Sequence, residues 1–287
     1  MKGLWRGFKG GGENMRENLI VVRARFIRNM KNYFRYPLNF ILTLFEPFIF
    51  IAPYYFMGKA FEQGGKVPGF VSYTGNSDYI GFIIVGYIVT TYFFTALWST
   101  GFTLKEEMMQ GTLEANWSTP ANRMAILLGS TLFQFCATTF EMILTIIICH
   151  FAFGFTITGS ILKMILFFIP GIISLIGLGI AVASLVLLAK DANSIIDLSS
   201  SIFQGLSGGF FPVKVLPKFM LFISLMLPLT YFNDGMRAIL IGQTPLFDLK
   251  IEFIIIIVSM FVFYGGGRYI FMKVEKRCRD KGLLSGH

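Results

Sequence analysis

Ionisable side chains are scarce inside the long apolar runs of this sequence, and the few that occur there can carry charge or protons. Glu46 precedes Pro47 in the first run, and Glu141 and His150 lie in the third. A charged group is costly in a bilayer and usually faces a protein interior or a water-filled cavity, so it marks a functional candidate. Mutual structural hydrogen bonding is the alternative interpretation of the two carboxylates.

The remaining residues do not assemble a metal centre or a nucleotide site. The chain has only His150 and His287, and Cys136, Cys149 and Cys278 include no CxxC pair. A zinc site with several histidines therefore cannot be built. No GxxxxGK[ST] loop occurs, so this chain is not expected to bind ATP. We predict no catalytic residue, no metal and no cofactor on this chain.

The composition is that of a polytopic helical membrane protein. Of the 287 residues, 54% are hydrophobic and 14% are charged, whereas a soluble globular chain has about 25% charged residues. Crossing roughly 30 Å of hydrocarbon takes about 20 apolar residues. We predict an all-α membrane protein with a transmembrane domain at 37–272. Its six expected spans lie at about 37–57, 79–104, 124–153, 161–189, 192–211 and 251–272.

Charge and segment length orient these spans. The apolar stretch 219–229 is only half a span, so a re-entrant or interfacial helix fits it better than a span, and we expect extracellular re-entrant helices at about 213–242. With six spans, both termini lie on the same side as most of the 25 Lys and Arg residues. The positive-inside tendency makes that side cytoplasmic. We expect a multi-pass plasma-membrane protein, and the net charge of +9 then indicates orientation and not nucleic acid.

Cytoplasmic segments flank the transmembrane domain at 1–36 and 273–287. Within the first, Leu19, Phe26 and Phe34 recur at helical spacing among basic residues. This pattern predicts an N-terminal amphipathic interfacial helix with a basic face. A solvated basic tail is the alternative.

The fifth span is the most polar of the six. Asp197, Ser201 and Gln204 share one helical face there, which we expect to line a translocation path or a dimer interface. Aromatic residues of the second span suit an apolar or amphipathic cargo, although core or lipid contact is the simpler interpretation. These residues are Tyr87, Tyr92, Phe93, Phe94 and Trp98.

A polar island at 105–123 interrupts the apolar runs on the cytoplasmic side. Met109, Leu113 and Trp117 are spaced i, i+4 and i+8, which places them on one face of a helix. Gly111 costs such a helix about 1 kcal/mol relative to Ala, so a partner is expected to stabilise it. A helix lying on the membrane surface is the alternative.

Two ordered motifs resemble a known family. The first consists of GTLE at 111–114, TP at 119–120, Arg123 and ILLG at 126–129. The second consists of SGGFFP at 207–212, LP at 216–217, LPLTY at 227–231, Asp234 and Arg237. Together they resemble the signatures of type-2 ATP-binding cassette (ABC) transporter permeases, in particular the drug-exporter branch.

The resemblance implies partners and roles for these residues. Such permeases pair with a second permease chain, as homodimers or heterodimers, and couple to a separate ATPase subunit that carries ATP and Mg. The island would be the coupling helix, at about 105–119. Its ATPase-coupling residues would be Glu106, Glu107, Met109, Gly111, Thr112, Leu113, Glu114, Trp117, Pro120 and Arg123. The re-entrant helices would contain Pro228, Tyr231, Asp234 and Arg237, the last two spaced for pairing.

The leading functional hypothesis is ATP-driven export of a hydrophobic or amphipathic cargo, such as a drug, a lipid-like molecule or a peptide, with membrane lipid as a further partner. A polysaccharide or lipid-linked glycan is an alternative cargo. An ion-coupled secondary transporter that uses Glu46, Glu141 and Asp197 is the alternative from another class. Against it, no matching pair of interrupted spans indicates inverted repeats.

Overall fold

The computed structural model describes residues 11–35, 37–109, 123–189 and 192–280. Within these ranges the secondary structure is helical, apart from one isolated β-bridge between Gln63 and Lys66. The elements are α1 (Gly11–Arg35), α2 (Pro37–Phe61), α3 (Pro68–Thr74), α4 (Tyr79–Met109), α6 (Arg123–Phe153), α7 (Ile161–Ala189), α8 (Ala192–Leu206), the 3₁₀ turn η1 (Val213–Val215), α9 (Lys218–Ser224), α10 (Pro228–Ile241) and α11 (Leu249–Asp280). The predicted all-α class is confirmed.

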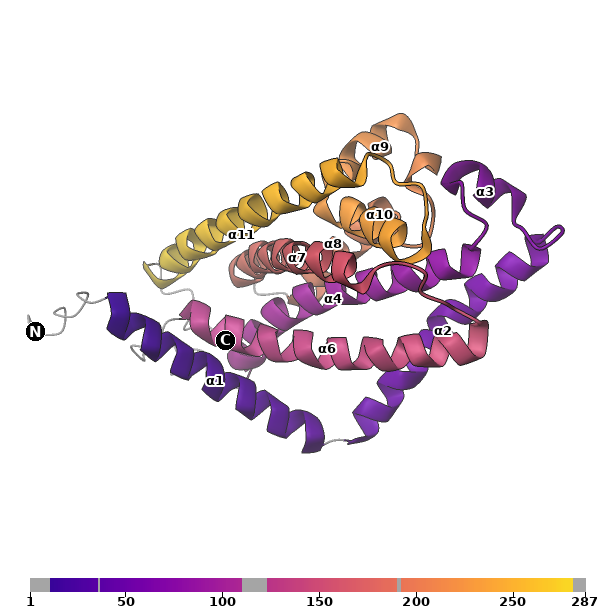
Figure 1. The fold of residues 1–287 in the computed structure, drawn as a ribbon. Helices are drawn as coiled ribbons and strands as arrows, with labels where there is room; N and C mark the ends of the chain where they lie inside the picture. The colour runs from indigo at the N-terminus through magenta and orange to yellow at the C-terminus, as the bar shows by residue number, and fades with distance from the viewer. Residues whose placement is uncertain (1–10, 36, 110–122, 190–191, 281–287) are drawn as a thin grey trace, which may run out of the picture.

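The long helices form a bundle with two distinct ends. Helices α4, α6, α7 and α11 run side by side, with α7 packed against both α4 and α11 (Figure 1). The short helices α3, α9 and α10 gather at one end of the bundle. The last turns of α4 and α11 and the first turn of α6 lie at the other end, which the predicted topology makes cytoplasmic.

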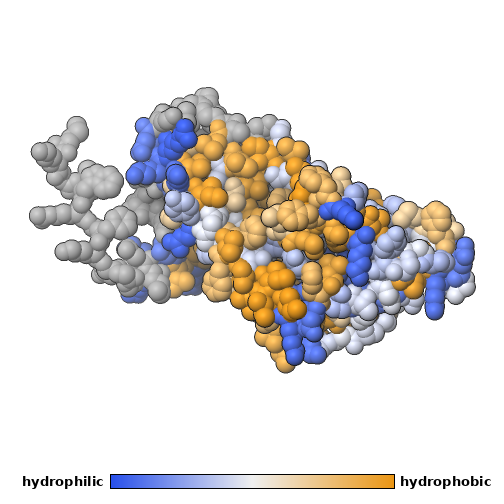
Figure 2. Space-filling model, turned by 90° about the horizontal axis from the view of Figure 1, so that it is seen from above, coloured by the Kyte–Doolittle hydropathy of each residue, from blue (hydrophilic) through white to orange (hydrophobic). Residues whose placement is uncertain are grey.

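Apolar side chains cover much of the outer surface. Helix α11 exposes Ile254, Val258 and Phe261, and α2 exposes Ile49 and Phe56. Figure 2 shows apolar residues over much of one face, with hydrophilic ones mainly toward its two ends. Helix α4 is apolar all round and mostly buried, as expected for a helix inside a bundle. The chain is a multi-pass membrane protein.

The number of crossings differs from the simple six-run prediction. By length and composition, five helices of the described chain can cross a membrane, and a sixth crossing requires α9 and α10, bent by 85°, to act as one broken span. The expected fifth span, 192–211, is shorter than predicted because α8 ends at Leu206 after 15 residues. That length is about 22 Å. Gly208 then adopts a φ of 69°, a left-handed conformation in which the helix cannot continue.

Small residues let α7 approach its neighbours closely. A methyl group at Gly177 would overlap the backbone of Phe263 in α11, and one at Gly267 would overlap the carbonyl of Gly177. On another face of α7, a methyl group at Gly179 would overlap the backbone of α4. Such small-residue faces are how helices pack in membranes, where lipid competes with apolar side chains.

Helix α1 runs parallel to α6 and contacts it along its length. A methyl group at Gly129 would meet the backbone of Val22, and the rings of Phe26 and Phe133 lie 5.5 Å apart. Farther along both helices, the Tyr33 hydroxyl donates a 2.6 Å hydrogen bond to Glu141. The spacing between contacting residues is nearly constant, so the two helices run in the same direction. The N-terminal helix is present as predicted, and its interfacial position stays a prediction.

The close contact between α7 and α11 predicts that alanine substitutions at two neighbouring glycines of α11 have opposite effects on stability. Gly267→Ala forces a methyl group against the Gly177 carbonyl, so we expect a loss of about 1–3 kcal/mol of stability. Gly266→Ala has no atom within 4 Å of the added carbon and serves as the matched control. It should keep or raise the midpoint of thermal unfolding, measured in detergent by size-exclusion chromatography after heating. Equal midpoints for the two variants would contradict this packing.

Candidate functional site

A large cavity opens between α1, α2, α4, α6 and α8. Its volume is about 660 Å³, within the range of roughly 300–1,000 Å³ that is usual for small-molecule sites. It is lined by Arg28, Asn29, Asn32, Tyr33, Thr43, Glu46, Phe50, Tyr87, Thr90, Thr91, Phe94, Thr95, Trp98, Ser99, Ser130, Phe133, Gln134, Thr138, Glu141, Gln204 and Phe210.

Helix α4 supplies the aromatic wall of this cavity. Tyr87, Phe94 and Trp98 all line it, as their i, i+7 and i+11 spacing allows. Tyr92 and Phe93, also candidates for the path, are buried elsewhere. The Tyr92 ring stacks edge-on against α7, and Phe93 is fully buried. One aromatic face of α4 thus lines the cavity and the other belongs to the core, and the role of the first face in a translocation path stays a prediction.

Hydroxyl groups join α4 to α6 along the cavity. The Thr95 and Thr138 hydroxyls lie 2.8 Å apart, and Tyr92 donates to Thr139 at 3.0 Å. The Thr95 hydroxyl also donates back to a carbonyl of its own helix, a common way to satisfy a threonine inside a helix. The cavity wall between α4 and α6 is therefore polar, and most of its hydroxyl groups have a hydrogen-bond partner.

The two carboxylates selected from the sequence, Glu46 and Glu141, face the same cavity. Glu141 accepts the hydrogen bond from Tyr33, a residue that sequence reasoning missed because nothing in its neighbourhood distinguishes it. Burial, and then the hydrogen bond to Glu141, raise the pKa of Tyr33 above the ordinary value of tyrosine. The phenol therefore stays protonated and acts as a donor to Glu141.

The polar face expected on the fifth span is only partly directed inward. Gln204 lines the cavity, whereas Asp197 and Ser201 are exposed on the outside of α8. The short α8 therefore contributes one side chain to the cavity wall. A dimer interface involving Asp197 and Ser201 stays a prediction.

His150 lies at the end of α6 and not among the cavity residues. Its ring is exposed, and Nδ1 lies 2.8 Å from the carbonyl oxygen of Phe155, just beyond the helix. This contact satisfies a carbonyl at a helix C-terminus. Among the described residues, no group of three or more His, Cys, Asp or Glu side chains could hold a metal ion.

Four of the residues predicted to couple to an ATPase lie at one end of α4 and α6, the two helices that contribute most of the cavity lining. Glu106, Glu107 and Met109 belong to the last turns of α4, and Arg123 opens α6. The other coupling candidates lie outside the described residues: Gly111, Thr112, Leu113, Glu114, Trp117 and Pro120. The island therefore joins, within one chain, the helices that supply most of the cavity lining.

At the opposite end, Arg237 of α10 is buried against the turn that follows α8. Its guanidinium donates to the carbonyls of Phe82, Gly208 and Gly209 and lies 3.4 Å from the centre of the Phe82 ring. Gly86 makes this approach possible, because a methyl group there would overlap the Gly209 carbonyl. Arg237 thus joins α10, α4 and the end of α8.

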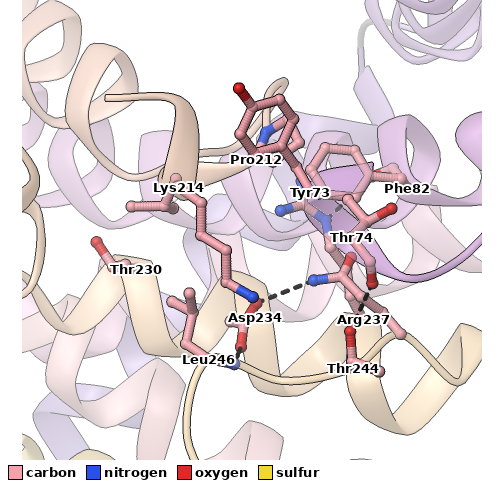
Figure 3. Close-up of a pocket in the computed structure, with 12 residues that line it drawn as sticks. Tyr73, Thr74, Phe82, Pro212, Lys214, Thr230, Asp234, Arg237, Thr244 and Leu246 are labelled. Atoms are coloured by element: carbon pink, nitrogen blue, oxygen red, sulfur yellow. Dashed lines mark hydrogen bonds between the residues drawn. The ribbon is translucent and has the colours of Figure 1, made fainter. Parts of the chain in front are cut away.

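Asp234, one turn before Arg237, has other partners. It accepts hydrogen bonds from the Gln243 side chain at 3.0 Å and from the Leu246 backbone amide at 2.6 Å (Figure 3). The i, i+3 spacing suggested pairing with Arg237, but the two side chains are held by separate partners. Tyr231 donates to the Leu225 carbonyl at 2.7 Å across the bend between α9 and α10.

The small pocket beside these residues is not a second cargo site. Its volume is only about 10 Å³ (Figure 3), close to the minimum that holds one water molecule. The residues around it therefore serve mainly to hold α10 against α4. The predicted Pro228 begins α10, and a re-entrant course for α9 and α10 stays a prediction.

Comparison with known proteins agrees with this architecture. The family described as ABC-2 type transporter matches residues 21–241. The probable multidrug ABC transporter permease YbhS of Escherichia coli K12 is 26% identical over 227 residues, which cover 77% of this chain and 55% of YbhS. The same protein of Escherichia coli O157:H7 gives the same values. The chain thus spans about half the length of the curated relatives it matches.

Arg237 should be essential for the stability of the fold. Arg237→Met leaves the carbonyls of Gly208 and Gly209, which lie beyond the end of α8, without their donor, and we expect a loss of at least about 2 kcal/mol, at roughly 1 kcal/mol per group. Lys214→Met, at an exposed position of η1, is the matched control. The measurement is the thermal unfolding midpoint in detergent. A midpoint for Arg237→Met that equals the Lys214→Met value would contradict the role assigned to Arg237.

Proposed function

Because the chain belongs to the ABC-2 type transporter family, we propose that it is the permease subunit of an ATP-driven exporter. Its cargo would be hydrophobic or amphipathic, and a separate ATPase subunit would bind ATP and Mg. The family match over 21–241 is the premise of this proposal. The multidrug function printed for YbhS belongs to that relative and is consistent with such a cargo.

The observation that carries the cargo class is the mixed chemistry of the cavity. Rings of Tyr87, Phe94 and Trp98 line the same space as the carboxylates of Glu46 and Glu141. A purely apolar ligand would leave the carboxylates without polar contact. An amphipathic molecule can contact both.

Force would reach the cavity through the island at 105–123. Helix α4 ends and α6 begins on either side of it, and both continue to the cavity without a break in the helix. A partner that holds the island would therefore move both cavity walls together. A second permease chain would complete the pathway.

An ion-coupled secondary transporter is the second candidate. The observation in its favour is that Glu46 and Glu141 face one cavity, as carriers of a cation or proton would. The two candidates differ in their energy source. Transport into vesicles that needs ATP and a P-loop partner identifies the exporter, and transport on an ion gradient without ATP identifies the alternative.

The decisive experiment is gentle purification of the tagged chain with its native partners. We expect a stoichiometric ATPase with a P-loop to accompany it, and Leu113→Asp with Trp117→Asp to abolish that association. Lys218→Asp, at the opposite end of the bundle, is the matched control and should keep the partner. A chain that purifies alone under conditions that preserve its fold would contradict the exporter.

Changes within the island should separate ATP hydrolysis from transport. Gly111→Pro and Glu114→Lys are expected to leave the chain folded in the membrane, because both positions belong to the polar island and not to an apolar run. Cargo transport per ATP hydrolysed should fall by at least about tenfold, measured in vesicles that contain both subunits. Normal transport by both variants would show that the island does not couple the two processes.

The proposed orientation predicts which positions an impermeant thiol reagent reaches in intact cells. In a Cys136→Ser background, which removes an exposed native thiol, Gly69→Cys and Lys218→Cys should be labelled. Lys276→Cys should be labelled only after permeabilisation. Native Cys278 is buried and would resist labelling on either side, so the exposed Lys276 is the informative position. Labelling of Lys276→Cys in intact cells would contradict cytoplasmic termini.

A further inference from the structure

Glu46 is the cavity carboxylate with the fewest polar contacts to other side chains. Its side chain projects from α2 beside Pro47, and no described side chain hydrogen-bonds to it or pairs with it. Glu141 faces the same space and interacts electrostatically with Glu46. Two carboxylates in one membrane cavity are unfavourable when both are ionised unless a cation lies between them.

Two buried hydroxyl groups also face this cavity without a partner. Thr90 of α4 and Ser130 of α6 are each 2% exposed, and no described group hydrogen-bonds to their side-chain oxygens. Buried polar groups are nearly always paired. These two oxygens are covered in this conformation, so they mark polar positions within the cavity wall and not groups presented to a bound molecule.

The aromatic surface lies next to the carboxylates. The rings of Phe50 and Tyr87 are 6.0 Å apart, and Tyr87 interacts electrostatically with both Glu46 and Glu141. Ring faces attract organic cations and also pack against apolar groups. The positive charge and the apolar body of one molecule can therefore be bound side by side.

The net charge of the cavity lining indicates how many positive charges a bound molecule would carry. Arg28 of α1 is the cationic side chain in the lining, against two carboxylates. With both acids ionised, the lining carries one net negative charge, which a monovalent cation neutralises. The volume of about 660 Å³ far exceeds that of a bare metal ion, so the space suits an organic cation.

We propose that the cavity binds monovalent organic cations with an aromatic or apolar body, with the charge placed between Glu46 and Glu141. Phe50 and Tyr87 contact the body. This inference names the cargo class of the proposed exporter and so rests on that function for its meaning. The binding site itself is a property of this chain.

The test is equilibrium binding to the purified full-length chain in lipid nanodiscs, without any ATPase. Two probes of nearly the same shape are compared, the cation tetraphenylphosphonium and the anion tetraphenylborate, with protein-free nanodiscs as the blank. We expect saturable binding of the cation in preference to the anion. Glu46→Gln and Glu141→Gln should each weaken cation binding by about tenfold, equivalent to about 1.4 kcal/mol, and the double variant should remove the preference for positive charge.

The matched control is Glu62→Gln, which removes a negative charge outside the cavity, where Glu62 pairs with Lys59 at 2.8 Å. It should leave the binding of both probes unchanged. Absence of saturable tetraphenylphosphonium binding to the wild-type chain would overturn the proposal. So would a folded, monodisperse double variant that binds the cation as the wild type does. Because no ATPase is present, failure of ATP-driven export would leave the binding result unaffected.

Discussion

The structure depends on one constraint, which is that polar groups inside a bilayer must find their partners within the protein. Arg237 shows the constraint most clearly. The chain leaves the helical conformation after Leu206, and the carbonyls of Gly208 and Gly209 lose their helical partners. A buried guanidinium offers five donors in a fixed plane, and it binds both carbonyls together with that of Phe82. The early end of α8 and the fold-back of α10 are therefore two parts of one arrangement.

The same constraint explains why the cavity is polar in a chain so apolar outside. Several hydroxyls of α4 and α6, such as those of Thr95, Thr138 and Thr139, bond to each other or to their own backbone, so they cost little where the helices meet. Glu46 and Glu141 would be costly against lipid, and their only inexpensive location is a space that admits water or a ligand. Polar residues are thus concentrated on the inner faces of α2, α4 and α6, while α2 and α11 present apolar side chains outward.

Hydropathy and spacing predicted the features that depend on one segment at a time. The apolar runs located α2, α4, α6, α7 and α11, and Glu46 and Glu141 were selected because charge in such runs is expensive. Contacts between side chains of two different segments could not be predicted from local sequence patterns. The i, i+3 spacing of Asp234 and Arg237 suggested a pair, but partners from α4 and the loops around α10 compete for both side chains. The position of Tyr33 is likewise set by the packing of α1 on α6, which no local pattern specifies.

The parallel packing of α1 on α6 has a mechanical consequence. Close backbone contact at Gly129 and the hydrogen bond at Glu141 fix α1 to α6 at two points along the helices. A movement of α6 that starts at its first turn, next to the island, would therefore carry α1 with it and displace Tyr33, Arg28 and Glu141 together. Helix α2 packs against α4 and α6 as well as against α1. Under the proposed function, pulling on the island would therefore act on every helix that lines the cavity, and would reach the site that holds the cation through all of them.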